Sequence, residues 1–361
     1  MFAVPTLYSG GAERVISILA NFWAASGREI SIATFETPAS TSYYQIDDRV
    51  RIHRLDLTPV SKPRWRAILH TFKRIGALRR LIRAERPDVI ISFLTKMNVM
   101  TAQAADGLGV PVIISERNNP YLQKFDTFWD LSRAIAFPKA FAFVTMTRGA
   151  AEFFPENQRP HTRIIPNPVS PISIAPKSHR GYNLTAVGRL TEQKRFDRLI
   201  EAFSIIEKDF PDWRLVIWGE GDLRQKLEAL RDTLGLKERI SFPGVTKRHG
   251  GWVETADLFT LSSDYEGWAN VLVEALACGI PIVSVDCDFG PKDILKGGEL
   301  GVLAPRDDVA AYASALARMM SNEALRRDYA AKGVEDAKRY LPAAMAAEWD
   351  LLIDEALAAK A

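Results

Sequence analysis

The sequence predicts an α/β fold with two doubly wound, parallel-sheet domains of the Rossmann type. Three observations support this prediction. Short apolar segments rich in β-branched residues alternate with longer segments of helical periodicity along most of the chain. A length of 361 residues exceeds one ordinary core and suits two domains. Near the middle, Pro166, Pro168, Pro171 and Pro176 interrupt the alternation, and we place the domain boundary there.

We therefore expect an N-terminal domain over residues 1–168, a C-terminal domain over residues 169–341 and a last helix over residues 342–361, with Pro342 at its start. Composition is that of a soluble globular protein, with 47% hydrophobic and 25% charged residues. Two cysteines and five scattered histidines lack metal-ligand spacing, so we expect no metal site and a reducing compartment. No apolar run is long enough for a membrane span.

Charge is divided unevenly between the two halves. Residues 1–168 contain 22 Lys and Arg against 14 Asp and Glu, a net charge of +8, which leaves 25 against 30, or −5, for the remainder. The basic half suggests an anionic partner. Its most basic segment, Lys62–Arg86, has nine Lys and Arg against Glu85 and an apolar stripe at helical spacing. Such a helix can pack on its own sheet, attach to anionic lipid, or do both.

The N-terminal half begins with a strand, a glycine pair and a helix. Gly10 and Gly11 separate the strand Phe2–Leu7 from the amphipathic segment Val15–Ser26, a geometry that offers backbone N–H groups to a phosphate. A glycine pair can equally serve only to make the turn. We expect the further strands of this half at Ile30–Phe35, Val50–Leu55, Asp88–Leu94, Val110–Ser115, Phe141–Thr147 and Arg163–Ile165.

Polar side chains follow two of these strands, where open α/β sheets bind ligands. They are Asn98, Glu116, Arg117 and Asn118. In the C-terminal half we expect strands at Leu184–Val187, Arg214–Trp218, Ile240–Phe242, Leu258–Leu261 and Ile280–Val285, and helices at Phe196–Asp209 and Leu223–Leu234. The loop after the first of these strands delivers Arg189 and Lys194 to a helix N-terminus, which favours a diphosphate.

The segment Asp264–Asp286 contains two carboxylates separated by seven residues, Glu266 and Glu274. On a helix this spacing would place both side chains roughly on one face. Taken alone, such a pair is more often a solvated helix face. Gly267 permits close backbone approach, and the start of the helix offers N–H groups to a phosphate. We therefore expect both carboxylates to contact one ligand.

Four motifs, in order along the chain, resemble those of the retaining GT-B glycosyltransferases of family 4. They are SGGAER at residues 9–14, GRLTEQKRFDRLI at 188–200, WGEGDLR at 218–224 and EGWANVLVEALACGIPIVS at 266–284. Further segments, ISFLTKMN, IISERNNP and DCDFGPKDIL, resemble the enzymes that extend lipid-linked oligosaccharides, such as bacterial N-acetylgalactosamine transferases. The resemblance implies two domains facing across a cleft, with the last helix packing back on the N-terminal domain.

The resemblance also implies roles for individual residues. Arg189 and Lys194 would bind the donor diphosphate, Glu274 the ribose and Glu266 the sugar hydroxyls, which gives Arg189, Lys194 and Glu266 the catalytic roles. Other donor contacts would come from Gly188, Gly219, Thr246, Gly267, Trp268, Ala269, Asn270 and Val271. Contacts to the acceptor or the diphosphate would come from Gly10, Gly11, Arg14, Asn98, Glu116, Arg117 and Asn118.

Where many relatives have a histidine after the strand ending at Ser115, this chain has Glu116, Arg117 and Asn118. Arg117 cannot act as a base at ordinary pH, but it could bind an acceptor phosphate or stabilise the transition state. Retention of configuration needs no protein base if the departing phosphate takes the acceptor proton. Fixed cations and helix dipoles also remove the requirement for a metal, so we expect no cofactor beyond the nucleoside diphosphate sugar.

We therefore expect a hexosyltransferase that uses a nucleoside diphosphate sugar, with UDP as the nucleotide, and a lipid-linked or glycan acceptor in surface polysaccharide assembly. It would be cytoplasmic and bound to the inner face of the plasma membrane, with no nucleic acid partner. A sugar-nucleotide epimerase of the same fold and a non-catalytic sugar-nucleotide-binding protein are the alternatives. A nicotinamide dehydrogenase is disfavoured because no GxGxxG follows a strand.

Overall fold

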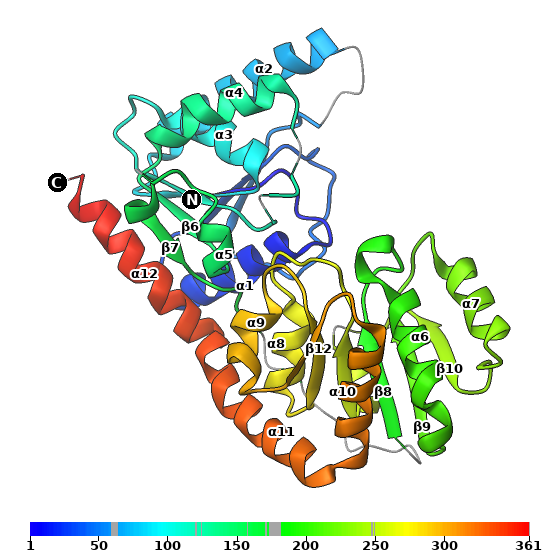
Figure 1. The fold of residues 1–361 in the computed structure, drawn as a ribbon. Coiled ribbons are helices and arrows are strands. Elements are labelled where there is room, and N and C mark those ends of the chain that lie inside the picture. Colours follow the sequence, from blue (N-terminus) through cyan, green and yellow to red (C-terminus); the bar gives the residue numbers. More distant parts are fainter. Residues whose placement is uncertain are drawn as a thin grey trace. The chain divides into compact units, whose positions relative to one another are not determined.

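The computed structural model describes residues 1–58, 64–119, 121–123, 125–156, 158–169, 172, 182–246, 248 and 250–360. Lys62, where the basic helix was expected to begin, and Pro171 and Pro176 of the expected domain boundary lie outside these residues. The chain divides into two compact units. The first unit contains Met1–Pro168 and Pro342–Ala361, and the second contains Val169–Leu341 (Figure 1).

The first unit is built on a parallel seven-stranded sheet with the order β3-β2-β1-β4-β5-β6-β7. Its strands are β1 Phe2–Ala3, β2 Ser31–Thr34, β3 Arg51–Arg54, β4 Ile90–Phe93, β5 Val112–Ser115, β6 Ala142–Thr145 and β7 Thr162–Ile164. The strand order reverses between β1 and β4. At such a switch point, the carboxyl ends of neighbouring strands open a crevice for ligands.

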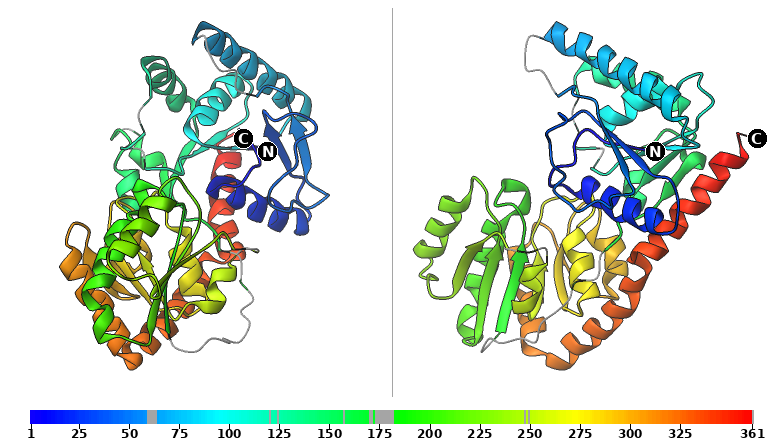
Figure 2. Two further views of the ribbon diagram at one scale, coloured as in Figure 1. Left: turned by 90° about the vertical axis from the view of Figure 1, so that its right-hand side faces the viewer. Right: turned by 180° about the vertical axis from the view of Figure 1, so that it is seen from behind.

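Helices cover both faces of this sheet. They are α1 Gly11–Ala25, α2 Arg64–Glu85, α3 Thr95–Ala105, α4 Thr127–Ala136, the short α5 Arg148–Ala151 and α12 Pro342–Ala358. Helices α2, α3 and α4 form one layer, in which α3 packs against both of the others (Figures 1 and 2). Helix α12 packs against α1 on the other face. Its Trp349 is fully buried, with its ring 6.1 Å from that of Phe93 at the end of β4.

The second unit is built on a parallel six-stranded sheet with the order β10-β9-β8-β11-β12-β13. Its strands are β8 Tyr182–Val187, β9 Trp213–Trp218, β10 Ile240–Gly244, β11 Leu258–Leu261, β12 Ile282–Asp286 and β13 Val302–Pro305. Its helices are α6 Phe196–Ile206, α7 Arg224–Thr233, α8 Asn270–Ala277, α9 Pro291–Ile294, α10 Val309–Ser321 and α11 Glu323–Ala337. The switch point of this sheet lies between β8 and β11.

The predicted fold class is confirmed, because both units are doubly wound parallel sheets with helices. The sequence prediction did not include α3, α4, β13, α10 or α11. Helix α1 begins at Gly11 rather than Val15, because Gly10 is already its extended N-cap residue. The glycine pair therefore belongs to the helix start.

The shared helix face expected for Glu266 and Glu274 is wrong. Helix α8 begins only at Asn270, and Glu266 lies before it in extended chain, where its N–H donates to the carbonyl oxygen of Asp288 at 3.1 Å. An adjacent backbone bridge links Tyr265 to Asp288. This pairing with the loop after β12 holds the chain extended, so that the helical periodicity stops short of Glu266.

Candidate functional site

Two charged side chains meet at the switch point of the second unit. Lys194, from the loop after β8, donates from Nζ to Glu266 Oε1 at 2.7 Å, and Glu266 comes from the loop after β11. Ser263 donates its hydroxyl to the same oxygen at 2.6 Å. The side chains of Lys194 and Glu266 are 15% and 8% exposed. Two strands that are adjacent in the sheet but far apart in sequence thus bring a cation and a carboxylate together where an α/β sheet binds ligands.

Arg189, from the same loop as Lys194, has a different environment. Its side chain is exposed, and it makes no ion pair with any residue that the structure describes. Lys194 ends a short 3-10 helix, Glu192–Lys194, and Arg195 then adopts left-handed backbone as the N-cap of α6. Two cations therefore flank the start of α6, where the helix dipole also favours an anion.

Glycines let the neighbouring loops pack closely at this end of the sheet. Gly219 follows β9 with φ +141°, and a Cβ there would overlap the carbonyl oxygen of Gly188. A Cβ on Gly188 would lie 3.0 Å from Cε of Lys194, so the lysine stem runs directly over this glycine. A side chain at Gly219 is thus excluded by backbone contact, whereas a Cβ at Gly188 would require the Lys194 stem to shift slightly.

The loop of Glu266 is held by ion pairs that the sequence analysis missed. Arg198 of α6, which is 4% exposed, binds Asp264 at 2.8 Å and Asp307 at 3.2 Å. Arg195 also reaches Asp264, at 3.3 Å. Ser263 and Asp264 had a signal in the sequence, since both lie in the loop that follows an expected strand. The others are brought together by tertiary packing.

The remaining predicted donor residues lie in helix α8, in the chain before it and in the loop after β10. Glu274 lies in α8 and is 3% exposed, and Ala269, the N-cap residue of α8, provides no side-chain cap. The indole of Trp268 is buried and packs edge-on against Tyr340 at 5.7 Å, so this side chain has a packing role. Thr246 follows β10 and is half-buried. The other predicted residues, Gly267, Asn270 and Val271, lead into or begin α8.

At the carboxyl end of the first unit's sheet, Glu116 lies in a buried hydrogen-bond network. Its Oε1 accepts from Asn98 Nδ2 at 2.8 Å, and its Oε2 lies 2.7 Å from the Thr95 hydroxyl. That hydroxyl is also 2.9 Å from Gln123 Oε1. Burial raises the pKa of the Glu116 carboxyl, against the opposing effect of its two hydrogen bonds. One hydroxyl proton cannot serve two acceptors, so this geometry fits a carboxyl that carries its own proton.

Arg117 points into the protein. Its Nε donates to Ser115 Oγ at 2.7 Å, and its Nη1 donates to the carbonyl oxygen of Ile165 at 3.0 Å and to Asn167 Oδ1 at 2.9 Å. The guanidinium also lies over the rings of Phe93 and Trp349, at 5.2 and 5.5 Å. Burial lowers its pKa to about 9. These contacts tie β5, the end of β7 and α12 together, which is a structural role that sequence reasoning did not foresee.

The other predicted residues of this edge differ in accessibility. Asn98 is fully buried and also donates to the carbonyl oxygen of Ser115 at 3.1 Å, whereas Asn118 is exposed. Gly11 is exposed, and Arg14 is 9% exposed. The carboxylate of Glu13 covers Gly10. The structure thus leaves Gly11 and Asn118 open to a ligand and buries Asn98 and Arg117 beneath them.

Within the described ranges, no group of three or more His, Cys, Asp or Glu is placed to hold a metal ion. None of the described helices combines the length and apolar character needed to cross a bilayer.

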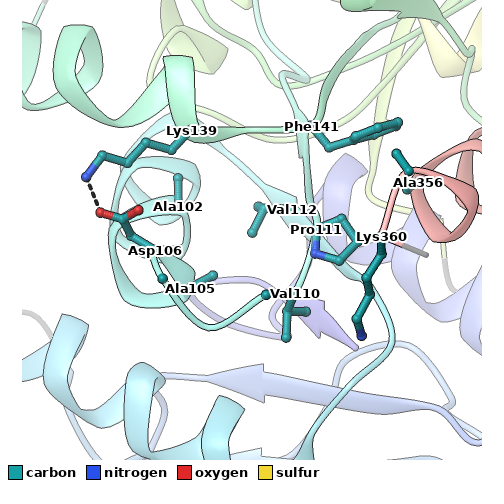
Figure 3. A pocket seen from close by; sticks show the side chains of 13 residues that line it. Ala102, Ala105, Asp106, Val110, Pro111, Val112, Lys139, Phe141, Ala356 and Lys360 are labelled. Carbon is teal, nitrogen blue, oxygen red and sulfur yellow. Dashed lines mark hydrogen bonds and ion pairs between the residues drawn. The ribbon is translucent and has the colours of Figure 1, made fainter.

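One pocket of the first unit, of about 340 Å³, lies at the amino ends of β5 and β6 (Figure 3). Figure 3 shows Asp106 and Lys139 paired on one side of it and Lys360 on another. None of the predicted site residues lines this pocket. It is at the opposite end of the strands from the edge where doubly wound sheets bind ligands.

The chain is similar to known protein families and to solved structures. The family model described as "Glycosyl transferase 4-like domain" matches residues 10–169, and the model described as "Glycosyl transferases group 1" matches residues 174–336. The chain belongs to the GT-B glycosyltransferases. This glycosyltransferase is 29% identical to the GalNAc-α-(1→4)-GalNAc-α-(1→3)-diNAcBac-PP-undecaprenol α-1,4-N-acetyl-D-galactosaminyltransferase of Campylobacter jejuni, over 98% of each chain.

Solved structures of similar fold cover nearly the whole glycosyltransferase. Sucrose-phosphate synthase from Thermosynechococcus elongatus superposes with a TM-score of 0.83 over 99% of each chain, at 19% identity. Anabaena HepE, in complex with UDP and glucose, superposes with a TM-score of 0.75 over 98% of each chain, at 16% identity. At these identities the similarity establishes the GT-B fold. The family assignment gives the epimerase alternative no support.

Proposed function

We propose that this glycosyltransferase is a retaining, metal-independent hexosyltransferase that moves a hexose or N-acetylhexosamine from a UDP-sugar to a lipid-linked or glycan acceptor. The observation that carries the proposal is the meeting of Lys194 and Glu266 at the switch point of the second unit, with Arg189 exposed in the same loop as Lys194. The cations suit a diphosphate and the carboxylate suits sugar hydroxyls. UDP as the nucleotide is supported by the UDP complex of the similarly folded HepE.

In this proposal, catalysis rests on positioning and fixed charge. The bond between the sugar C1 and the phosphate oxygen breaks while the acceptor oxygen bonds to C1. Arg189 and Lys194 stabilise the charge that develops on the departing diphosphate. The acceptor proton passes to an oxygen of that diphosphate, so no protein base is needed. Glu266 holds sugar hydroxyls and Glu274 holds the ribose.

A screen of nucleotide sugars for thermal stabilisation tests the donor site. A ligand that binds only the folded state raises the unfolding midpoint by mass action, so the strongest stabiliser identifies the donor. In the Glu274→Ala variant we expect a lost response to the donor and lost transfer, with circular dichroism unchanged. Full transfer by this variant would refute the assignment of the ribose site.

The proposed acceptor is a lipid-linked glycan, bound at the edge of the first unit that includes Gly10, Gly11, Arg14 and Asn118. The printed name of the C. jejuni relative describes an acceptor linked to undecaprenol through a diphosphate, which supports the proposal. Extension of a radiolabelled, undecaprenyl-diphosphate-linked glycan would test it. If only soluble glycans were extended, the lipid-linked part of the proposal would fail.

We further propose that the first unit binds the anionic inner face of the plasma membrane, from the cytoplasmic side. Helix α2 exposes Ile68, Leu69 and Phe72, the last two at 53% and 59%. Its Lys73 and Arg80 are also exposed and line a groove of about 790 Å³ together with Leu69 and Phe72. Each cation near such a surface contributes about 1 kcal/mol, while the apolar side chains enter the interface.

Helix α4, in the same layer as α2, extends this surface. It exposes Leu131 and Ile135, one turn apart, at 62% and 52%. Two helices with exposed apolar side chains, of which α2 also carries exposed cations, are complementary to an anionic bilayer, which is the partner we propose. The charge excess of the N-terminal half supports the same partner.

Liposome flotation tests this surface. We expect the protein to float with vesicles of phosphatidylcholine and phosphatidylglycerol, and much less with phosphatidylcholine alone. The double variant Leu69→Ser/Phe72→Ser should lose binding, whereas Leu351→Ser, at a 63% exposed leucine of α12, should not. Equal flotation with both vesicle types would refute the electrostatic part. Self-association that these serines abolish would indicate a second copy instead of a membrane.

A further inference from the structure

Lys194 is already paired before any ligand binds. Its ammonium lies 2.7 Å from Glu266 Oε1, and the same oxygen accepts the Ser263 hydroxyl at 2.6 Å. Both charged side chains are mostly buried, so their attraction is weakly screened. Arg189, by comparison, is exposed and makes no ion pair within the described ranges. The two cations assigned to the diphosphate therefore differ, since only the charge of Lys194 is compensated.

The pairing of Glu266 is also asymmetric between its two oxygens. Oε1 takes both Lys194 and Ser263, and no described side chain or N–H group bonds to Oε2. A sugar hydroxyl can therefore bond to Oε2 without displacing either existing partner. A lysine ammonium has three donors, so Lys194 can likewise bind a phosphate while it keeps Glu266.

We propose that Glu266, through Lys194, makes the site favour the intact nucleotide sugar over the nucleoside diphosphate that transfer leaves behind. This inference rests on the proposed function and assigns Glu266 a second role in it. The transferred sugar of the donor provides hydroxyls for Oε2 of Glu266, and the nucleoside diphosphate product lacks this sugar. Once the product's terminal phosphate releases the acceptor proton, it carries one more negative charge than the donor. Compensation of Lys194 by Glu266 weakens the hold on that charge, which speeds product release.

The test is calorimetric titration with UDP, ADP and GDP, using whichever binds the wild type most tightly. Glu266→Gln removes the charge and keeps a similar shape, so Lys194 is left uncompensated. We expect this variant to bind the nucleoside diphosphate about tenfold more tightly than the wild type does. Ser263→Ala is the matched control, because it removes a hydrogen bond to the same oxygen but no charge. Its affinity should stay within about twofold of the wild-type value.

Repeating the Glu266→Gln change in a Lys194→Ala variant shows whether the gain in affinity depends on Lys194. In Lys194→Ala, the further change Glu266→Gln should strengthen binding by less than about threefold, because the compensated cation is gone. Overall affinity should also fall. Unfolding midpoints of all variants, measured in parallel, show that each chain is folded at the titration temperature.

Three outcomes would overturn the inference. If Glu266→Gln binds the nucleoside diphosphate no more tightly than the wild type, Glu266 does not weaken the affinity of the site for this product. If the gain is undiminished in Lys194→Ala, the carboxylate repels the phosphate directly and the pair is irrelevant. If the folded wild type binds none of the three nucleotides, the proposed donor site itself fails, a result distinct from the first two.

Discussion

The carboxyl ends of the two sheets treat their charged residues in opposite ways. In the first unit, Glu116 and Arg117 are buried and bonded to neighbouring loops and strands. In the second unit, Arg189 is exposed, and Glu266 pairs with Lys194 through Oε1 while no described group bonds to its Oε2. Both edges carry charged residues after a strand in the sequence. The difference teaches that a charged side chain at a strand end is either bonded within the protein or left open to a ligand. Which of the two occurs depends on whether the surrounding loops cover that side chain.

The largest expected effect concerns Arg189. Arg189→Ala should lower the transfer rate by about 10²–10³-fold, because a cation aimed at the leaving diphosphate is lost. The unfolding midpoint should not change, since the side chain is exposed and makes no ion pair with the described residues. Initial rates with the donor found by the thermal screen, together with thermal unfolding, measure both quantities. Wild-type rates would show that this edge does not bind the diphosphate through Arg189.

Arg117, unlike Arg189, should affect the stability of the protein when it is replaced. Arg117→Ala removes three buried hydrogen bonds and the contacts with Phe93 and Trp349, so we expect a loss of about 3 kcal/mol in unfolding free energy. Arg117→Lys keeps the charge but not the planar fork, and should also lose stability. Denaturant unfolding measures this loss, with Arg189→Ala as the matched arginine control. Unchanged stability with lost acceptor binding would instead support the predicted ligand role of Arg117.

Glu116 should give the smallest effect, and its sign depends on pH. Its folded pKa is raised above the ordinary value of 4.5, so the folded state retains a proton that the unfolded state has released. Its contribution to stability is therefore present below about pH 4.5 and is lost as pH rises through the folded pKa. Glu116→Gln mimics the protonated form and can still bond to Thr95 and Asn98.

We expect Glu116→Gln to match the wild type in stability near pH 4.5 and to exceed it by about 1 kcal/mol, or about 2–4 °C, near neutral pH. Thermal unfolding from pH 4.5 to 8 measures this difference. A variant that is less stable at neutral pH would show that Glu116 is ionised in the folded protein. Loss of transfer without loss of stability would indicate that its carboxyl contacts the acceptor.

The pattern of apolar and polar residues in the sequence was sufficient to predict most of the strands. The apolar segments Leu258–Leu261 and Val112–Ser115 lie in strands because apolar runs bury well in a parallel sheet, and Gly279, with φ +64°, follows the end of α8. The helices α10 and α11 of the second unit were not predicted. Helix α11 has little amphipathic character, so tertiary packing, such as that of Gly333 against Leu276, stabilises it.

The sequence by itself determined the fold class, because this depends on local periodicity, and its motifs carry the resemblance to the family. The same motifs place Lys194 and Glu266 in loops after strands and Glu274 in a helix. The tertiary structure alone decided what each charge touches. It joined Lys194 to Glu266 across 72 positions of sequence and placed Arg117 over the rings of Phe93 and Trp349. The partners of buried charged side chains come from segments far apart in the chain. Which residues pair therefore depends on the order of the strands in the sheet.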